Sequence, residues 1–247
     1  SSDLAQFSTS DAENYPGYLD YSRKIYDNSA QVFLYEPFHE VGKLLKEKKM
    51  PSPFDVFKLD VFRSVHDANS AYFKDEDIVK IFDRYATYNG SSPYLAPATL
   101  NNISHVELNL GGYYVKGGIY RIVEALTTIL EKMDVAINFN TPVNEILTEN
   151  NSVKGISVNG KKIDYDYVVS NADVVYTHNH LLNGKSRRKH KLNKLEPSLS
   201  AMLLLWGMDT TFDGLKHHNV IFPENYRQEF IDIFDRKTVP EDPAIYI

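Results

Sequence analysis

Two glycine pairs, Gly111-Gly112 and Gly117-Gly118, are the residues whose spacing most directly suggests chemistry in this chain. Glycine tolerates a positive φ and lets a ligand or another backbone approach closely. A phosphate-binding loop would need a lysine and then a hydroxyl residue after the second glycine, and Gly118 and Ile119 stand there instead. No G-x-G-x-x-G sequence is present either. The glycines therefore indicate either a structural turn or a bend that accommodates something flat or bulky.

The other polar residues do not form the patterns of common hydrolases or metalloenzymes. The sequence has no G-x-S-x-G, no H-E-x-x-H and no cysteine, so it offers no thiolate chemistry or cysteine-ligated metal. His178 and His180 are two residues apart, a spacing that would place both on the same face of a strand, but no third metal ligand is evident. Adjacent residues of a strand point to opposite faces, so His217 and His218 make a poor metal pair. We expect no metal site.

The elements that would position the glycines are predicted from periodicity. An amphipathic helix follows them, with apolar residues at helical spacing: Ile119, Ile122, Val123, Leu126, Ile129 and Leu130. Strands are expected at 135–139 and 144–148, and Asn159-Gly160 predicts a hairpin that joins 153–158 to 161–164. A buried strand is expected at 167–170. It is followed by Asn171-Ala172-Asp173, at the strand end where open α/β sheets bind ligands.

The flanking regions are predicted to be mainly helical on the N-terminal side and β-type on the C-terminal side. Residues 8–49 are expected to form helices, with Ser8 or Ser10 as the cap, and 55–67 and 75–88 form a second helical group. The abundant aromatic residues of that group are typical of helix packing, or of a tunnel wall. An apolar β-type run is expected at 199–208, and Asp232 and Asp235 lie on the polar face of a later helix.

Several of these segments carry a specific resemblance. It begins with YATYNGSSPYLAP at 85–97, His105-Val106-Glu107, and GGYYVKGGIYRI at 111–122. This series resembles the central part of bacterial carotenoid desaturases, the phytoene dehydrogenase and dehydrosqualene desaturase family, within the flavin amine-oxidase-like superfamily. The run INFNTPVNEI at 137–146 also resembles the wider superfamily. The likeness extends weakly into both flanks and covers most of the chain.

The resemblance implies a mixed α+β or α/β fold. We expect a helical substrate- or membrane-facing region at 1–105, an interrupted segment of an FAD-binding domain with a β-hairpin at 106–180, and part of an antiparallel substrate sheet at 181–247. The family's N-terminal dinucleotide fingerprint and C-terminal flavin-contacting segment have no counterpart here. Together with the ends of the sequence, this leads us to expect a central fragment.

The resemblance also implies the cofactor, FAD, and the site residues. Val143 matches the position whose main chain usually meets the adenine ring, and Asn171 and Ala172 are expected near the cofactor. Gly117 and Gly118, with Tyr114 nearby, match positions beneath the flavin and substrate cavity and are expected to bind substrate. No catalytic residue is assigned, because the family reaction transfers a hydride to the flavin and a proton to a base or solvent.

The function implied is desaturation of a long apolar isoprenoid, a carotenoid precursor of the phytoene or dehydrosqualene type. Two other classes stay open. One is a flavin oxidoreductase of the amine-oxidase or retinoid-saturase type, which would leave no new conjugated double bond. The other is a non-enzymatic module that binds apolar ligands, which would carry no flavin.

Charge and hydropathy restrict the partners. The net charge of −6 argues against nucleic acid, and the basic run at 185–194 is typical of a surface loop. The basic run at 43–50 indicates either a solvated helix end or a contact with a membrane surface. No apolar run approaches the length of about 20 residues that a membrane span needs, and no signal peptide is evident. We expect a cytoplasmic protein that is peripheral to the membrane.

Overall fold

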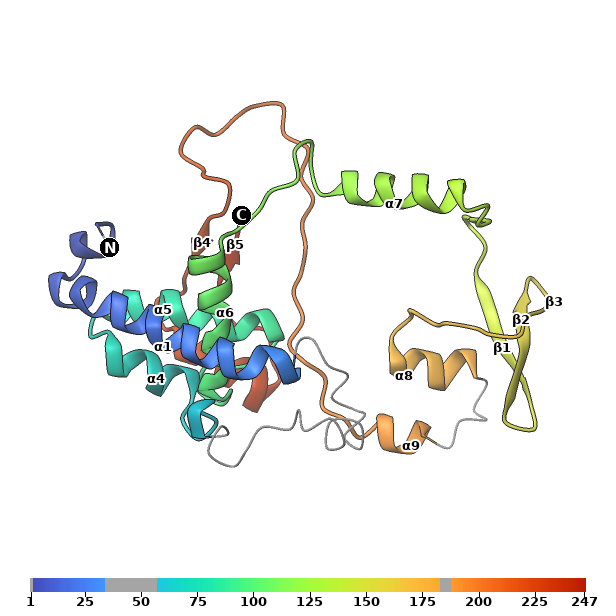
Figure 1. Ribbon diagram of the computed structural model, residues 1–247, viewed down its shortest axis with the longest axis horizontal. Coiled ribbons are helices and arrows are strands. Elements are labelled where there is room, and N and C mark those ends of the chain that lie inside the picture. The colour runs from blue at the N-terminus through green and yellow to red at the C-terminus, as the bar shows by residue number, and fades with distance from the viewer. Residues whose placement is uncertain (1, 34–56, 183–187) are drawn as a thin grey trace. The chain divides into compact units, whose positions relative to one another are not determined.

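The computed structural model describes residues 2–33, 57–182 and 188–247. The chain separates into two compact units: unit 1 combines Ser1–Tyr113 with Ser198–Ile247, and unit 2 is Tyr114–Pro197. Helices and two small antiparallel sheets make up the described ranges (Figure 1), so the predicted mixed α and β composition is confirmed. The functional division at 105 and 180 stays a prediction.

Unit 1 is mainly helical, and side chains define where its central helices begin. Ser64 accepts a hydrogen bond from the backbone N–H of Asp67 at the start of α4, and Asp75 accepts two at the start of α5. The helices are η1 (Leu4–Gln6), α1 (Thr9–Phe33), α4 (Val65–Tyr72), α5 (Glu76–Asp83), η2 (Arg84–Asn89), η3 (Ala98–Asn101), α6 (Asn102–His105), η4 (Val106–Leu110), α10 (Tyr226–Phe230) and η6 (Ile231–Arg236). Strands β4 (Val220–Ile221) and β5 (Ile245–Tyr246) pair antiparallel.

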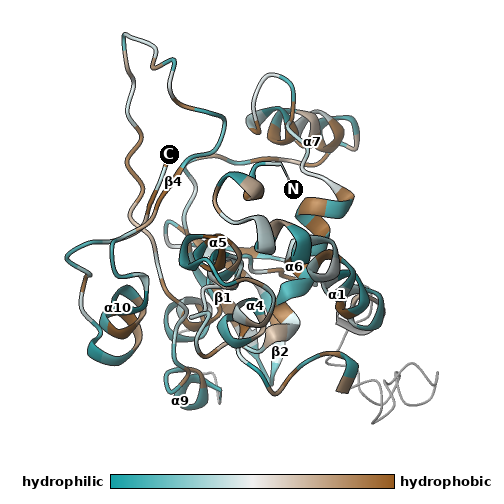
Figure 2. Cartoon of the chain, turned by 90° about the vertical axis from the view of Figure 1, so that its left-hand side faces the viewer, coloured by the Kyte–Doolittle hydropathy of each residue, from teal (hydrophilic) through white to brown (hydrophobic). Residues whose placement is uncertain are grey.

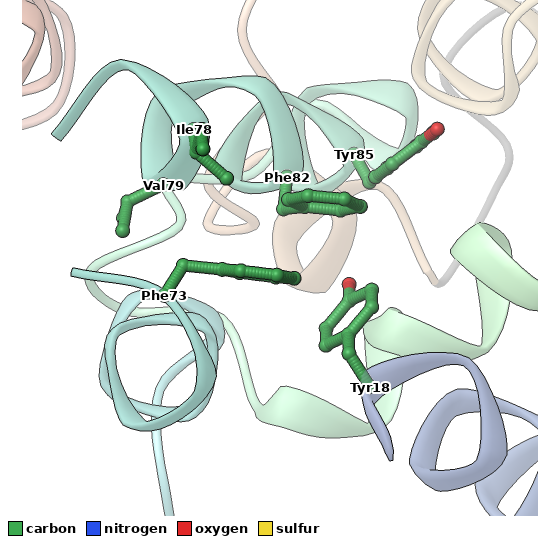
Figure 3. Packing of buried hydrophobic residues seen from close by; sticks show 6 residues of the cluster. All are labelled: Tyr18, Phe73, Ile78, Val79, Phe82 and Tyr85. Atoms are coloured by element: carbon green, nitrogen blue, oxygen red, sulfur yellow. The ribbon is translucent and has the colours of Figure 1, made fainter. Parts of the chain in front are cut away.

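The core of unit 1 is an aromatic and aliphatic cluster from α1, α4–α5 and η2. Its buried members, drawn in Figure 3, are Tyr18, Phe73, Ile78, Val79, Phe82 and Tyr85. The rings of Phe73 and Phe82 stack with centroids 4.5 Å apart, and Tyr18 packs on Phe82 at 4.6 Å. Phe73, Phe82 and Tyr85 of this helical group are therefore core residues, which is one of the two interpretations that the sequence left open, whereas Tyr88 is 55% exposed.

Two buried polar side chains connect α1 to the later helices. The carboxylate of Asp11 is fully buried and accepts hydrogen bonds from the backbone N–H groups of Lys74 and Asp75. The hydroxyl of Tyr18 lies 2.8 Å from that of Ser104. Burial raises the pKa of Tyr18 well above its usual value. These bonds satisfy groups that would otherwise be costly to bury.

The predicted helix at 55–67 is interrupted in its described part, because residues 57–58 and 65–67 are helical and 59–64 are not. Asp60 has a φ of 51°, and Ser64 is extended, so α4 begins only at Val65. The predicted helices over 8–33, 75–88 and around Asp232 are confirmed by α1, by α5 with η2, and by α10 with η6. The basic run at 43–50 and residues 185–187 lie outside the described residues. No helix in the described ranges has the length and apolar character to cross a bilayer.

Unit 2 contains the predicted amphipathic helix, α7 (Tyr120–Lys132), and a three-stranded antiparallel sheet. The sheet order is β1 (Val143–Glu149), β2 (Ser152–Val158) and β3 (Lys161–Asp164). Asn159 and Gly160 have φ values of 48° and 78°, so the predicted hairpin is confirmed. Asn150 and Asn151, with φ of 51° and 61°, turn the chain between β1 and β2 in the same way.

Three predicted strands are not formed. Residues 135–139, 167–170 and 199–208 pair with no strand in the described part of the chain. The segment expected to be buried is instead open, since Tyr167 is 90% exposed and Val169 94% exposed. An apolar run becomes a strand only when a neighbour supplies backbone partners, which the run itself does not encode. The short pair β4–β5 is the part of the predicted antiparallel substrate-side sheet that the structure contains.

Truncating the centre of the core tests this arrangement. Phe82→Ala removes a ring that contacts Tyr18, Phe73 and Tyr85, and we expect it to lower the free energy of unfolding by about 3–5 kcal/mol. Phe62→Ala is the matched control, because Phe62 is 78% exposed and should cost less than about 1 kcal/mol. Urea unfolding measures both. Equal losses would contradict the described core.

Candidate functional site

Unit 2 contains a cavity of about 560 Å³ beside its sheet. Its walls come from the start of β1, the inner residues of β1 and β2, the segment 165–172, and the helical turns that follow. The lining residues are Pro142, Val143, Ile146, Ile156, Tyr165, Tyr167, Val168, Val169, Ser170, Asn171, Ala172, Tyr176 and Leu181. None of them carries a charge, so the cavity suits an uncharged, mainly apolar group.

The sheet wall of the cavity depends on a close approach between strands. Ile146 of β1 pairs directly with Ile156 of β2, and both line the cavity. Beside them, Gly155 has a φ of 150°, and a Cβ at this position would lie 2.0 Å from the carbonyl oxygen of Ile163. Glycine is therefore required where β3 packs against β2.

The second wall is fixed by hydrogen bonds around the Ser-Asn-Ala-Asp turn. Asp173 caps α8 (Val174–Tyr176) by accepting a hydrogen bond from the backbone N–H of Tyr176 at 2.9 Å. The hydroxyls of Ser170 and Thr177 lie 2.9 Å apart, and the Thr177 hydroxyl donates to the carbonyl oxygen of Ala172 at 3.4 Å. The turn is thus tied to α8 and to η5 (Thr177–Leu181).

The predicted site residues divide into two groups. Val143, Asn171 and Ala172, predicted near the cofactor, line this one cavity although they come from β1 and from the turn after β3. Tyr114, Gly117 and Gly118, predicted to bind substrate, do not line it. They precede α7 in the same unit, where Gly117 and Gly118 have φ values of 88° and 94°. The predicted glycine bend is therefore present, and the binding roles stay predictions.

Sequence reasoning missed most of the apolar lining. Tyr165, Tyr167 and Tyr176 contribute aromatic wall that no pattern singled out. Their positions in the sequence could have indicated a place in this wall, because Tyr165 and Tyr167 come just before the Val-Val-Ser-Asn-Ala run and Tyr176 follows it within one helical turn. The expectation of a strand at 167–170 hid this signal, since alternate residues of a strand would point away from the cavity.

The histidines considered as metal ligands have other contacts. The ring of His180 packs on Tyr176 with centroids 4.7 Å apart. The rings of His217 and His218 lie 4.4 Å apart, so the expectation that they point to opposite faces is wrong, because these residues precede β4. His218 is hydrogen bonded to the hydroxyl of Tyr246. Within the described ranges, no three His, Asp or Glu side chains converge.

Comparison with known protein families identifies the chain at the level of family. The family model of flavin-containing amine oxidoreductases matches residues 8–195, which include the cavity and the helices before it. The chain belongs to this family. The resemblance drawn from the sequence is therefore confirmed, whereas the assignment of a flavin-domain segment to unit 2 stays a prediction.

The relatives are enzymes of carotenoid metabolism. The chain is 35% identical over 230 residues to 1-hydroxycarotenoid 3,4-desaturase of Flavobacterium sp. (strain P99-3), covering 93% of this chain and 47% of the relative. It is 31% identical over 244 residues to phytoene desaturase of Neurospora crassa, covering 94% and 41%. It is 29% identical over 232 residues to 4,4'-diapolycopene oxygenase of Methylomonas sp, covering 93% and 46%. The chain thus spans less than half the length of these relatives.

A substitution at Gly155 tests what shapes the cavity. Gly155→Ala places a methyl group against the backbone of β3 at a φ unfavourable for alanine, so we expect a loss of roughly 2 kcal/mol or more in the stability of unit 2. Gly207→Ala is the control, because a Cβ there meets nothing within 4 Å. Amide hydrogen exchange of β2 and β3 measures the effect. Unchanged exchange in Gly155→Ala would contradict the described packing.

Proposed function

We propose that the protein to which this chain belongs is an FAD-dependent desaturase that introduces conjugated double bonds into a carotenoid precursor. The observation that carries the proposal is the uncharged cavity that gathers Val143, Asn171 and Ala172, the three residues predicted to meet the cofactor. Membership of the flavin-containing amine oxidoreductases and similarity to carotenoid desaturases support it.

The cavity fits the adenine end of a dinucleotide better than its phosphates. A flat heterocycle suits apolar walls with a few polar groups, here Ser170 and Asn171, whereas phosphates would need cationic side chains or a glycine-rich loop. Val143 would contribute main-chain groups beside the ring, and Asn171 and Ala172 would close the other side. When bound, the flavin supplies the two-electron acceptor that desaturation requires.

The substrate side of the proposal rests on the segment around α7. The bend at Gly117 and Gly118 leaves space at Gly118, where a Cβ would meet nothing within 4 Å, whereas a Cβ at Gly117 would lie 3.1 Å from the side chain of Arg121. Parts of the α7 ribbon are brown in Figure 2, the colour of hydrophobic residues. Ile119, just before the helix, and Val123 and Leu126 within it are 77%, 48% and 56% exposed. Such a surface matches a long hydrocarbon that must be kept from water. We propose that Tyr114, Gly117 and Gly118 border that substrate.

A second candidate function is oxygenation of a carotenoid, which the similarity to 4,4'-diapolycopene oxygenase favours. The two reactions use apolar polyenes and differ in product, since oxygenation adds an oxygen atom and desaturation only removes hydrogen. Peripheral attachment to a membrane stays a prediction.

Filling the cavity tests the assignment of cofactor residues. Ala172→Phe should occlude the proposed adenine site and reduce the flavin retained per protein by about tenfold or more. Ala201→Phe is the control, because Ala201 is exposed and outside the cavity. Both are made in the protein expressed in a host that produces the colourless isoprenoid precursor. Absorbance of released flavin and of polyenes in the lipid extract gives the two readouts.

The outcomes separate the hypotheses. The proposal is supported if the parent protein and Ala201→Phe contain flavin and yield coloured polyenes, and Ala172→Phe loses both. Flavin with an oxygenated product would favour the second candidate. Full flavin retention in Ala172→Phe would contradict the assigned cofactor cavity, and a parent protein without flavin would leave only an apolar-ligand-binding module.

A further inference from the structure

A second cavity, of about 850 Å³, lies in unit 1 between α4, α5 and the start of α10. It shares no lining residue with the cavity of unit 2, and nothing in the proposed desaturation uses it. Its lining residues are His66, Ser70, Phe73, Lys74, Glu76, Val79, Lys80, Asp83, Tyr94, Glu224, Asn225, Tyr226 and Arg227. Unlike the first cavity, it is rich in ionisable groups.

At one wall of this cavity, the buried carboxylate of Asp83 is hydrogen bonded to the imidazole of His66. Asp83 is 1% exposed, and its Oδ2 atom lies 2.7 Å from Nδ1 of His66 while Oδ1 accepts a hydrogen bond from the amide of Asn69 at 2.8 Å. Both carboxylate oxygens are therefore engaged within the protein. The hydrogen bond with Asp83 raises the pKa of His66. The imidazole therefore stays protonated to a higher pH than an isolated histidine, and in that form its other nitrogen can donate.

Two tyrosines add hydroxyl groups without partners. Tyr226 is only 4% exposed, and its hydroxyl has no hydrogen-bond partner among the described residues. The hydroxyl of Tyr94 also has none in the described ranges. The ring of Tyr94 contacts two ionisable side chains. Its centroid lies 4.7 Å from that of the His66 ring and 5.0 Å from the guanidinium carbon of Arg227. A hydroxyl that no protein acceptor engages can donate a hydrogen bond to a ligand in the cavity.

Arg227 completes the set, because no carboxylate in the described part of the chain pairs with it. The charged groups around His66 come from every neighbouring element. They are Asp67 on α4, Lys74 between α4 and α5, Glu76, Lys80 and Asp83 on α5, and Glu224 and Arg227 at α10. Glu76 and Glu224 are exposed, and Lys80 is paired with Asp77 at 3.1 Å. The donors left for a ligand are therefore the second ring nitrogen of His66, the hydroxyls of Tyr94 and Tyr226, and the guanidinium of the exposed residue Arg227.

We propose that this cavity is a binding site for a small anion, a carboxylate or a phosphate group, held by Arg227, His66 and the hydroxyls of Tyr94 and Tyr226. A guanidinium presents parallel N–H groups that match either anion, and a charged imidazole strengthens the bond. The site is independent of the flavin cavity, and its existence does not rest on the proposed function.

Isothermal titration of the protein with inorganic phosphate and with acetate tests the proposal. Arg227→Gln and His66→Gln should each weaken binding by about tenfold or more, and Tyr226→Phe by a few-fold. Arg236→Gln is the matched control on the same helical stretch, because Arg236 is exposed and paired with Asp232 outside the cavity. Arg227 is itself exposed, so its variant should fold. The imidazole NMR signal of His66, assigned with His66→Gln, should shift on binding in the parent protein.

Sulfate, whose charge is constant near neutral pH, tests the role of the imidazole. The pKa of His66 is raised, so the cationic form persists below that pKa and is lost above it. Affinity for sulfate should therefore increase as the pH falls from about 8 to about 6, and the dependence should vanish in His66→Gln. A pH dependence retained in that variant would overturn the role assigned to His66.

The source of a phosphate group is distinguished with vesicles. The site would be assigned to a lipid headgroup if three results are obtained together. The protein binds phosphatidylcholine vesicles that contain phosphatidic acid, Arg227→Gln abolishes this binding, and free phosphate does not bind. Binding of free phosphate or acetate alone would assign it to a soluble anion. The proposal is overturned if neither free anion nor vesicle binds, or if Arg236→Gln weakens binding as much as Arg227→Gln.

Discussion

The packing of Tyr18 against Phe73 and Phe82 is the interaction on which the helical unit depends. Tyr18 is fully buried in α1, its ring contacts aromatic residues contributed by α4–α5, and its hydroxyl reaches Ser104 of α6. Helices as short as α4, α5 and α6 are not stable alone in water. Their stability therefore comes from this shared core, and the walls of the anion-site cavity, which include Phe73 and Val79, are part of the same packing.

The second unit is held together in a different way. Among its described residues, the buried hydrophobic side chains are Ile146, Val158 and Leu181. Its order comes from strand pairing, from turns at positive φ, and from the hydrogen bonds that fasten the Ser-Asn-Ala-Asp turn to Thr177. A wall built this way leaves apolar side chains such as Tyr167 and Val169 open to a ligand. Beside the cavity, Gly155 allows the close approach of β3 to β2.

Local signals in the sequence were sufficient for some of this structure. The Asn159-Gly160 turn and the α7 helix each follow from a few neighbouring residues, and the structure has both. Pairing is not local: the run at 199–208 is as apolar as a strand, yet no described strand pairs with it. The resemblance to a flavin family predicted Val143, Asn171 and Ala172 as cofactor-site residues, and all three line the cavity of unit 2. His66, Asp83 and Arg227 formed no pattern, because they meet only through the fold.

The proposed function requires that electrons pass from an apolar polyene precursor to a bound flavin. The measurement that tests this most directly is anaerobic mixing of the flavin-loaded protein with the colourless precursor in vesicles, followed by visible absorption in a single turnover. The account predicts that the oxidised-flavin absorbance falls while absorbance of a longer conjugated polyene rises in proportion. A flavin that stays oxidised while the precursor is unchanged would contradict it.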